Sequence, residues 1–198
     1  MIFWYTGEME NKSESMGAKK RIKIELATSE DVRGMQDVFY KSWLATYPNK
    51  EHGITVDDVE DRFKDLFTEE VLAKRAKRII NPPEGETLFF AKEGDKIVGL
   101  CRVVKSKKNN RILAIYVLPK YQGQRVGKLL WKEAQKYIDP EKDTLLSVAT
   151  YNYNAINFYK SLGFEDTGKK FTEERLRMKS GAVIPEMEME LKGKKNFP

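Results

Sequence analysis

Residues 111–127, RILAIYVLPKYQGQRVG, decide the fold of this chain. Their first part is a short run of β-branched and aromatic residues, which is typical of a buried strand. Pro119 ends that strand, because proline has no N–H to give to a sheet. The glycine-bearing turn that follows leads into an amphipathic pattern over residues 126–138. The sequence therefore predicts a strand, a tight turn and the start of a long helix in succession.

Such a junction favours an anion-binding site. Free N–H groups and the helix dipole attract negative charge at a helix start, and glycine lets a phosphate approach the backbone. Arg125 and Lys128 would add full positive charges there. The turn is too short for a P-loop, and no acidic residue follows at the distance that a Rossmann motif requires. The alternative is a plain strand–helix junction that binds nothing.

The same stretch resembles the central motif of the GNAT superfamily of acetyl-CoA-dependent N-acetyltransferases, a Gln/Arg-x-x-Gly-x-Gly/Ala turn after a strand. Gln122 and Gly127 match this motif, whereas Arg125 stands in place of its middle glycine. Residues 152–164, NYNAINFYKSLGF, are similar to the second signature of the family. Two motifs in the right order are far more specific than either alone. The resemblance covers roughly residues 22–192.

The resemblance implies how acetyl-CoA would be held. The strand edge near Val117 would offer backbone groups to the pantetheine amides and an N–H to the thioester carbonyl. The turn would hold the pyrophosphate, and asparagines of the second motif would hold the pantetheine arm. The residues expected to bind acetyl-CoA are Ile115, Tyr116, Val117, Gln122, Gly123, Gln124, Arg125, Val126, Gly127, Lys128, Asn152, Asn154 and Phe158.

Tyr159 matches the tyrosine that serves the family as general acid. A phenol suits proton transfer to the coenzyme thiolate, because its reference pKa of about 10 is near that of a thiol. The alternative is a core tyrosine, since Tyr159 falls on an ordinary apolar helical stripe. The single cysteine, Cys101, lies in a strand-like run and is interpreted as a buried small hydrophobe, with an acetylated nucleophile as the alternative.

The general base is where the sequence departs from the family. Many relatives carry a glutamate at the start of the central strand, but Asn109, Asn110 and Arg111 stand there in this chain. Candidate bases are Glu86, His52 and Glu51, or a chain of water molecules, and each of these side chains also reads as an ordinary surface residue.

The acceptor side is predicted to be acidic and aromatic. Residues 51–65 hold six carboxylates against one arginine and one lysine, in a chain with net charge +6. Acidic and aromatic groups together suit a polycationic amine. This segment, with the residues before it, also resembles the front of PaiA-type spermidine/spermine acetyltransferases. The alternative is a solvated helix face. The expected acceptor-binding residues are Trp43, Tyr47, Glu51 and Asp57.

Composition excludes several other classes. No apolar run reaches the length of a membrane span, and the apolar start lacks the basic region of a signal peptide, so we expect a cytoplasmic protein. One cysteine and one histidine argue against a disulfide and a metal site. The basic residues are spread along the chain without a nucleic-acid-binding motif, and a polyanionic coenzyme explains a basic face equally well.

We expect residues 1–19 to form a flexible leader and residues 20–198 to form one domain. The alternative for the leader is an arm that contacts a second copy in a homodimer through Phe3, Trp4 and Tyr5. The predicted order β-α-α-α-β-β-β-α-β-α-β-β indicates an α/β fold. The resemblance implies the GNAT arrangement of this fold, a mixed central sheet of about six to seven strands flanked by helices.

The sequence as a whole predicts an N-acetyltransferase that moves the acetyl group of acetyl-CoA directly to a primary amine in a ternary complex. A polyamine is the leading acceptor, and a protein N-terminus, a lysine or an aminoglycoside-like amine is the alternative within this class. The alternative outside this class is a regulator that binds acetyl-CoA and senses it without turnover.

Overall fold

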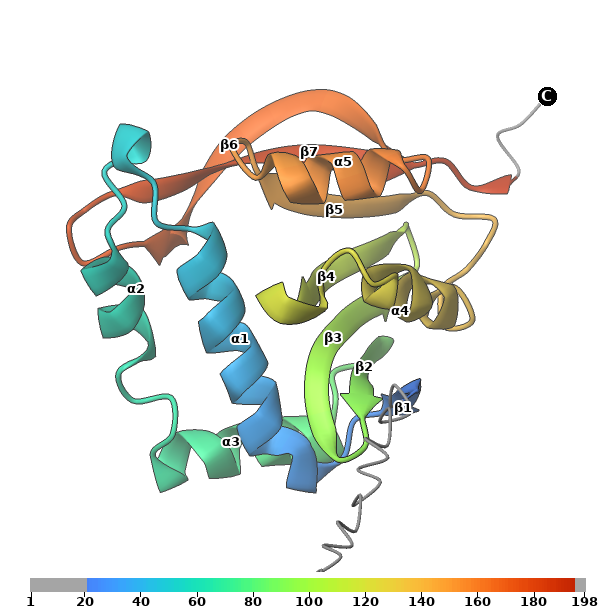
Figure 1. Cartoon of the computed structure of the whole chain (residues 1–198). Helices are drawn as coiled ribbons and strands as arrows, with labels where there is room; N and C mark the ends of the chain where they lie inside the picture. Colours follow the sequence, from blue (N-terminus) through green and yellow to red (C-terminus); the bar gives the residue numbers. More distant parts are fainter. Residues whose placement is uncertain (1–20, 195–198) are drawn as a thin grey trace, which may run out of the picture.

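A computed structural model describes residues 21–194 of the chain. Its centre is a seven-stranded mixed sheet with the order β1-β2-β3-β4-β5-β7-β6, in which only β4 and β5 run parallel (Figure 1). This confirms the predicted α/β fold. The strands are β1 (Ile22–Leu26), β2 (Glu86–Glu93), β3 (Lys96–Lys105), β4 (Asn110–Val117), β5 (Thr144–Ala149), β6 (Glu165–Arg177) and β7 (Val183–Leu191).

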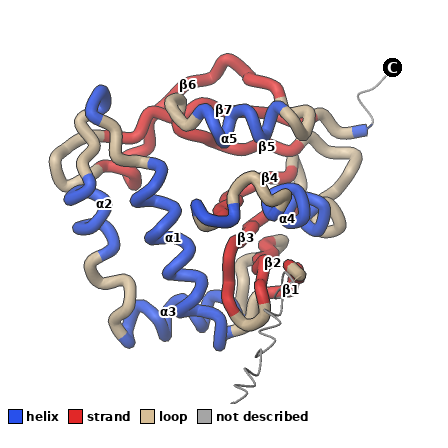
Figure 2. Tube along the Cα trace, viewed as in Figure 1, coloured by secondary structure: helices blue, strands red, loops and turns tan. Residues whose placement is uncertain are grey.

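Helices cover both faces of the sheet. Figure 2 shows α1, α2 and α3 gathered on one side of β3, with α4 on the other side. Two of the helical segments begin with a capping box, formed by Thr28 and Asp31 before α1 and by Thr55 and Asp58 at the start of α2. The helices are α1 (Val32–Thr46), α2 (Val56–Phe63), α3 (Glu69–Ile80), α4 (Val126–Ala134) and α5 (Tyr153–Lys160), with short 3-10 turns η1 (Ser29–Asp31), η2 (Lys50–His52) and η3 (Pro119–Tyr121).

The core is centred on β3. Every residue of this strand from 97 to 101 is buried, because α1 and α4 both contact it. A strand covered on both faces needs a continuous apolar run rather than alternation. Phe90 and Leu100, which pair across β2 and β3, have no exposed surface. The central strands are therefore a rigid base for the segments that follow β4.

The sheet opens between β4 and β5. The two strands pair only where Asn110, Arg111 and Ile112 lie beside residues 144–146, and the rest of β4 has no partner on that side. The buried Asn110 fixes the closed end: its amide donates to the carbonyls of Asp139 and Lys142, and its oxygen accepts from the N–H of Asp139. Beyond Ile112 the β5-facing edge of β4 is free to pair with something else.

Two predicted boundaries are wrong. The sequence favours a strand over residues 164–171 followed by a polar loop rich in lysine and arginine, but β6 continues to Arg177. β6 is the edge strand and is mostly exposed, so its polar side chains carry no burial signal. The helix expected to reach Ile138 ends at Ala134 and continues as turns. The predicted leader and its aromatic residues lie outside the described residues.

Candidate active site

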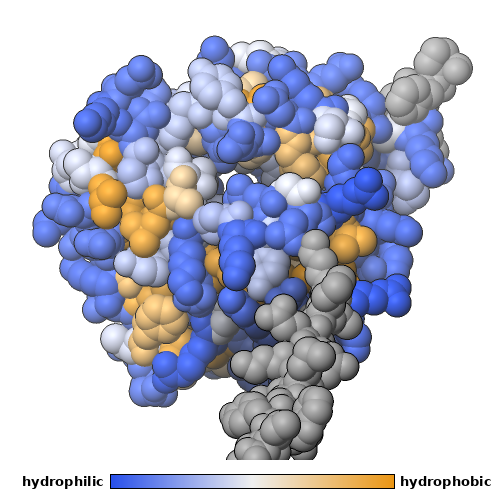
Figure 3. Space-filling model, in the orientation of Figure 1, coloured by the Kyte–Doolittle hydropathy of each residue, from blue (hydrophilic) through white to orange (hydrophobic). Residues whose placement is uncertain are grey.

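A cleft of about 1000 Å³ lies where β4 and β5 part. The space-filling view shows the molecule hollowed between the part that carries α5 and the part that carries β4 and α4 (Figure 3). Its walls come from the end of β4, the turn before α4, the start of α5 and the last turns of α1. The cleft thus contains all of the predicted acetyl-CoA residues except Gln124, whose amide instead donates to the Lys120 carbonyl at 2.8 Å.

The turn before α4 is held in an unusual conformation. Arg125 is the N-cap of α4 with φ 65° and ψ 6°, and among residues 21–194 it is the only residue other than glycine with positive φ. Its side chain does not cap the helix. The first N–H groups of α4 therefore remain available at the cleft, beside the guanidinium of Arg125 and the ammonium of Lys128.

Two other residues of the turn shape it differently. Gly123 has φ 73°, which glycine adopts without strain, and a side chain there would meet nothing within 4 Å. Gly127 allows α4 and α5 to pack closely, because a Cβ at this position would lie 3.1 Å from the ring of Phe158 on α5 and would push that ring aside. Gln122 donates to the carbonyl of Val117 at 3.0 Å, which ties the turn to the end of β4.

The start of α5 forms the opposite wall of the cleft. Asn152 caps this helix by accepting from the N–H of Ala155 at 3.1 Å, so its side-chain NH₂ remains free to donate. Asn154 lines the cleft and is exposed. Tyr153 and Asn157 also line it, although the sequence analysis did not select them. Both residues lie close to Asn154 in the sequence of this short helix, and this proximity could have predicted that they line the cleft as well.

Tyr159 is 7% exposed and lines the cleft. Its hydroxyl makes no hydrogen bond within the described residues, and its ring packs against those of Phe158 and Phe164. Burial raises the pKa of Tyr159 strongly, so the phenol keeps its proton at neutral pH. Cys101 is fully buried and burial raises its pKa as well, which makes it an inert neutral thiol, in line with its interpretation as a small hydrophobe.

An aromatic cluster closes the α1 side of the cleft. The hydroxyl of Tyr116 accepts from the indole N–H of Trp43 at 3.2 Å and lies 3.3 Å from the hydroxyl of Tyr47. Trp43 is 8% exposed and lies in a hydrophobic cluster with Ile54. Trp43 and Tyr47 are therefore placed behind Tyr116, and they do not line the cleft. The α1 residues that do line it are Ser42, Ala45 and Thr46.

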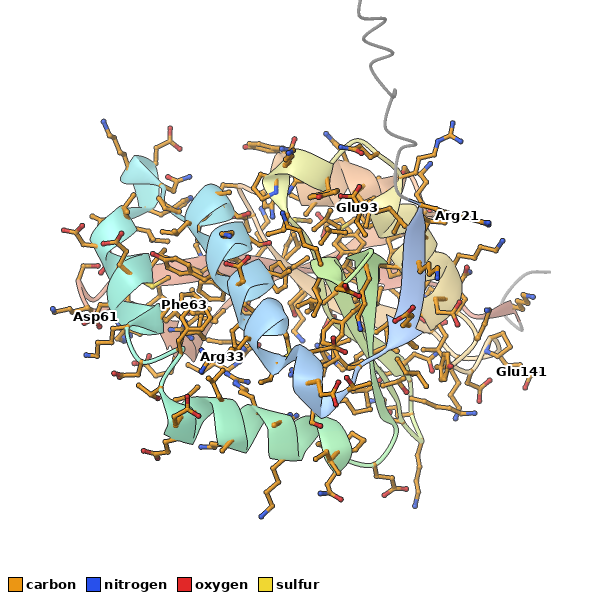
Figure 4. All side chains as sticks on the ribbon, turned by 60° about the horizontal axis from the view of Figure 1, so that its bottom comes forward. Arg21, Arg33, Asp61, Phe63, Glu93 and Glu141 are labelled. Atoms are coloured by element: carbon orange, nitrogen blue, oxygen red, sulfur yellow. The ribbon has the colours of Figure 1, made fainter. Side chains whose placement is uncertain are left out.

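The acidic segment faces mainly outward. Glu51 and Asp57 are exposed and lie outside the cleft lining. Figure 4 shows Asp61 on the outer side of α2, whereas Phe63 points towards α1. Asp58 is buried and accepts from Thr55 and from the backbone and side chain of Ser180. Burial alone would raise the pKa of Asp58, but these hydrogen bonds outweigh it and lower the pKa to about 2.

Glu186 is a carboxylate that the sequence analysis missed. It lies on β7 opposite Ala149, in the last pair of the β5–β7 ladder, where β5 has already parted from β4. Ile184, two residues earlier and so on the same face, packs with Trp43 on the α1 side. Glu186 is 8% exposed and its Oε2 has no hydrogen-bond partner among the described residues. Burial raises the pKa of Glu186.

The base candidates named from the sequence have different surroundings. Glu86 is paired with Arg78 at 2.9 Å and lines a separate pocket that shares no lining residue with the cleft. His52 stacks on Tyr151 with ring centroids 4.9 Å apart, and Tyr151 lines the cleft. Glu51 precedes His52 and is exposed near this rim.

Within residues 21–194, no group of three or more potential metal ligands comes together, and no helix is long and apolar enough to cross a membrane.

Comparison with known proteins links this geometry to a family. A family model described as an acetyltransferase (GNAT) domain matches residues 48–190. The PaiA N-acetyltransferase from Thermoplasma acidophilum, solved in complex with coenzyme A, has a similar fold with a TM-score of 0.65, at 20% identity over 87% of this chain and 99% of that chain.

Two further solved structures have the same fold. The ribosomal-protein-S18-alanine N-acetyltransferase from Escherichia coli matches with a TM-score of 0.59, at 17% identity over 90% of this chain and 99% of that chain. A putative acetyltransferase, yncA, from Salmonella typhimurium, solved with acetyl-CoA, also matches with a TM-score of 0.59, at 17% identity over 90% of this chain and 97% of that chain.

Proposed function

Because this chain belongs to the GNAT acetyltransferase family, we propose that it transfers the acetyl group of acetyl-CoA directly to a primary amine. The observation that carries the proposal is the cleft at the parting of β4 and β5, with the N-terminus of α4 on one wall and the hydroxyl of Tyr159 on the other. Acetyl-CoA supplies the activated acetyl group as a thioester. The residues of the chain bind the coenzyme, polarise the thioester carbonyl and protonate the leaving thiolate.

The cleft fits the chemistry of the coenzyme. The free edge of β4 past Ile112 offers N–H and C=O groups to an extended amide chain, as a sheet edge does to an added strand. At its end, the first turn of α4 and the charges of Arg125 and Lys128 suit a pyrophosphate. A backbone N–H near Val117 would polarise the thioester carbonyl.

Tyr159 is proposed as the general acid. Its hydroxyl has no partner within the described residues, so it is free to donate, and burial keeps the phenol protonated until a strong base forms beside it. Burial disfavours the charged thiolate as it disfavours the phenolate, so the departing sulfur becomes a base strong enough to take this proton. Proton donation of this kind contributes typically 10²–10⁴-fold to a rate.

We expect Tyr159→Phe to lower kcat by roughly 10²–10⁴-fold while the Kd for coenzyme A stays within about twofold. Thiol release from acetyl-CoA measures the first quantity and calorimetric titration the second. Tyr40→Phe removes a hydroxyl from a tyrosine that packs on Phe63 outside the cleft, and it should leave both quantities unchanged. Unchanged turnover in Tyr159→Phe at saturating coenzyme would remove Tyr159 from the mechanism.

Glu186 is proposed as the base that receives the proton of the acceptor amine. Its carboxylate is buried, lacks a hydrogen bond at Oε2 within the described residues, and lies at the open end of the β4–β5 gap. Burial raises the pKa of Tyr47 and Tyr116, and the charge of Glu186 adds to both shifts, so the carboxylate is close to this hydroxyl pair. A carboxylate with a raised pKa is matched to a base that operates near neutral pH.

Glu186→Gln should remove the acidic limb of the kcat/KM profile. In the parent protein activity rises with pH as this carboxylate loses its proton, and the raised pKa places that limb above the usual glutamate range. Glu188→Gln is the matched control, because Glu188 lies on the same strand but is paired with Lys169 at 3.5 Å. An acidic limb of unchanged position and size in Glu186→Gln would show that another group is the base.

A polyamine is proposed as the acceptor. The buried carboxylate of Glu186 can pair with one ammonium group, and the exposed Glu51 near the Tyr151 rim can pair with a second. Asp57 extends the acidic surface along α2. Asp58 is excluded from this role because Thr55 and Ser180 occupy its carboxylate.

The test is thiol release from acetyl-CoA with spermidine, spermine, lysine peptides, peptides with free N-termini and aminoglycosides. Turnover of polyamines, with a KM raised by Glu51→Gln and Asp57→Asn, supports the proposal. Preference for a peptide N-terminus makes the chain a protein N-acetyltransferase. If no amine is turned over while acetyl-CoA still raises the Tm, the chain is a coenzyme sensor rather than an enzyme.

A further inference from the structure

A second pocket lies beneath α1 and α3, against β1, β2 and β3. Its volume is about 270 Å³, and it shares no lining residue with the acetyl-CoA cleft. Apolar side chains form its walls, among them Met35 and Phe39 from α1, Ile79 from α3 and Leu88 from β2. Nothing in the proposed acetyl transfer uses this pocket.

The polar part of the pocket is strongly cationic. Three guanidinium groups line it, those of Arg75, Arg78 and Arg102, against the single carboxylate of Glu86. Arg78 takes one oxygen of that carboxylate at 2.9 Å. The Nε of Arg102 lies 3.7 Å from the other oxygen, which is too far for a hydrogen bond. Two positive charges are therefore left over inside the pocket.

Two of the guanidiniums are incompletely paired. The Nε of Arg102 is buried and has no hydrogen-bond partner among the described residues. Arg75 forms no ion pair with any residue of the described part of the chain. Burial lowers the pKa of Arg75 and of Arg102, and the neighbouring Arg78 adds to both shifts, whereas the charge of Glu86 opposes the shift of Arg102. A buried N–H without an acceptor is costly, so the Nε of Arg102, with the unpaired charge of Arg75 beside it, favours an anion that enters the pocket.

We propose that this pocket binds a small organic acid, through a carboxylate held by Arg75 and Arg102 and a compact apolar body packed against Phe39 and Leu88. Guanidinium groups match a carboxylate because their planar N–H donors form paired hydrogen bonds. The apolar walls select an acid with a branched or aromatic body over an inorganic anion. The volume lies below the range of about 300–1,000 Å³ for drug-sized ligands, so the acid is small.

The position of the pocket connects it with the cleft through one helix. Met35 and Phe39 line the pocket, and Ser42 and Thr46, further along the same face of α1, line the cleft. Phe39 also packs edge-on against Tyr116, with ring centroids 5.3 Å apart. The pocket and the cleft thus have different lining residues but lie close together along α1. Because they do not overlap, the acid binds whether coenzyme A is present or absent.

The test is calorimetric titration of the full chain with phenylacetate and with isovalerate, in the presence and absence of saturating coenzyme A. The expected result is saturable binding of at least one acid, with a Kd below about 1 mM, that coenzyme A does not displace. Phenylacetamide, which has the same body without the charge, and inorganic phosphate, which has the charge without the body, should each bind at least fivefold more weakly.

Variants place the acid within the protein. Arg75→Gln and Arg102→Gln should each weaken binding by at least fivefold, whereas Lys77→Gln, an exposed cation of α3 outside the pocket, should not. Arg75 is on the surface-facing side of the pocket, so its variant tests the site even if Arg102→Gln does not fold. The proposal is overturned by absence of binding at about 10 mM acid, by equal affinity in Arg75→Gln, by displacement with coenzyme A, or by phosphate that binds as tightly as the acids.

Discussion

Arg125→Gly should yield a more stable protein than Arg125→Ala, although both variants remove the same charge. Arg125 has φ 65° and ψ 6° at the N-cap of α4, where the family motif has glycine. A residue with a Cβ costs roughly 1–2 kcal/mol in this left-handed conformation. Glycine avoids that cost but loses roughly 0.5–1 kcal/mol, because its unfolded chain is more flexible. Alanine at an N-cap is also less favourable than glycine.

Together these terms leave about 1 kcal/mol in favour of the glycine variant. For a chain of about this length, that corresponds to a Tm higher by roughly 2–4 °C. Thermal unfolding and urea unfolding of the two variants and the parent measure the difference, and an unchanged urea m-value shows that only stability has changed. Equal midpoints for the two variants would refute the reasoning, because they would mean that no strain is stored at Arg125.

The same pair of variants separates charge from backbone shape in coenzyme binding. Each variant loses one exposed cation at the proposed pyrophosphate site. Losing this charge should cost about 1 kcal/mol of binding free energy, which corresponds to a fivefold rise in the Kd for coenzyme A. The two rises should be equal if the turn keeps its shape. A much larger rise for Arg125→Ala than for Arg125→Gly would mean that the backbone, rather than the guanidinium, determines affinity.

Two further predictions concern stability and cleft shape. Asp58→Ala should cost about 2–4 kcal/mol at pH 7, because it removes the carboxylate that accepts from the N–H and hydroxyl of Thr55, the N-cap of α2, and from the N–H and hydroxyl of Ser180. In the folded protein the pKa of Asp58 is lowered to about 2, so its carboxylate stabilises the fold most while it is charged. The difference in urea midpoint between parent and variant should therefore persist above pH 4 and shrink as pH falls towards 2. A difference that stays constant over this range would contradict the prediction. Gly127→Ala should weaken coenzyme A binding by about tenfold, because the new Cβ would lie 3.1 Å from the Phe158 ring that lines the cleft. The Tm should change little, because alanine favours a helix by about 1 kcal/mol over glycine. Unchanged affinity for coenzyme A in a titration would contradict this prediction.

The sequence predicted those parts of the fold and of the cleft that depend on residues close to one another in the chain. The strand before Pro119, the turn and the start of α4 follow from neighbouring residues, and the structure has them in the predicted places. The residues predicted to bind acetyl-CoA line one cleft for the same reason, because both motifs lie at the two strand ends that part. Gln124 is the exception, since its long side chain turns back to the Lys120 carbonyl.

The acceptor side depends on contacts between distant segments, and local patterns do not reveal it. Trp43 and Tyr47 are predicted to bind the acceptor because they precede the acidic segment. In the structure both bond to the hydroxyl of Tyr116, about seventy residues away, and Phe63 covers Trp43 at 5.3 Å between ring centroids. Asp58 looked equivalent to its acidic neighbours, yet Ser180 from the β6–β7 turn buries it.

Glu186 shows the same limit most clearly. It is the first of three glutamates that alternate along β7, at 186, 188 and 190, a pattern typical of a solvated strand face. Glu188 and Glu190 follow that expectation and pair with Lys169 and Lys192. Glu186 has no ion pair in the described part of the chain, because it lies under α1 at the end where the sheet has opened. A carboxylate buried without a counter-ion reduces stability, and this cost is the reason to test the proton-transfer role proposed for Glu186.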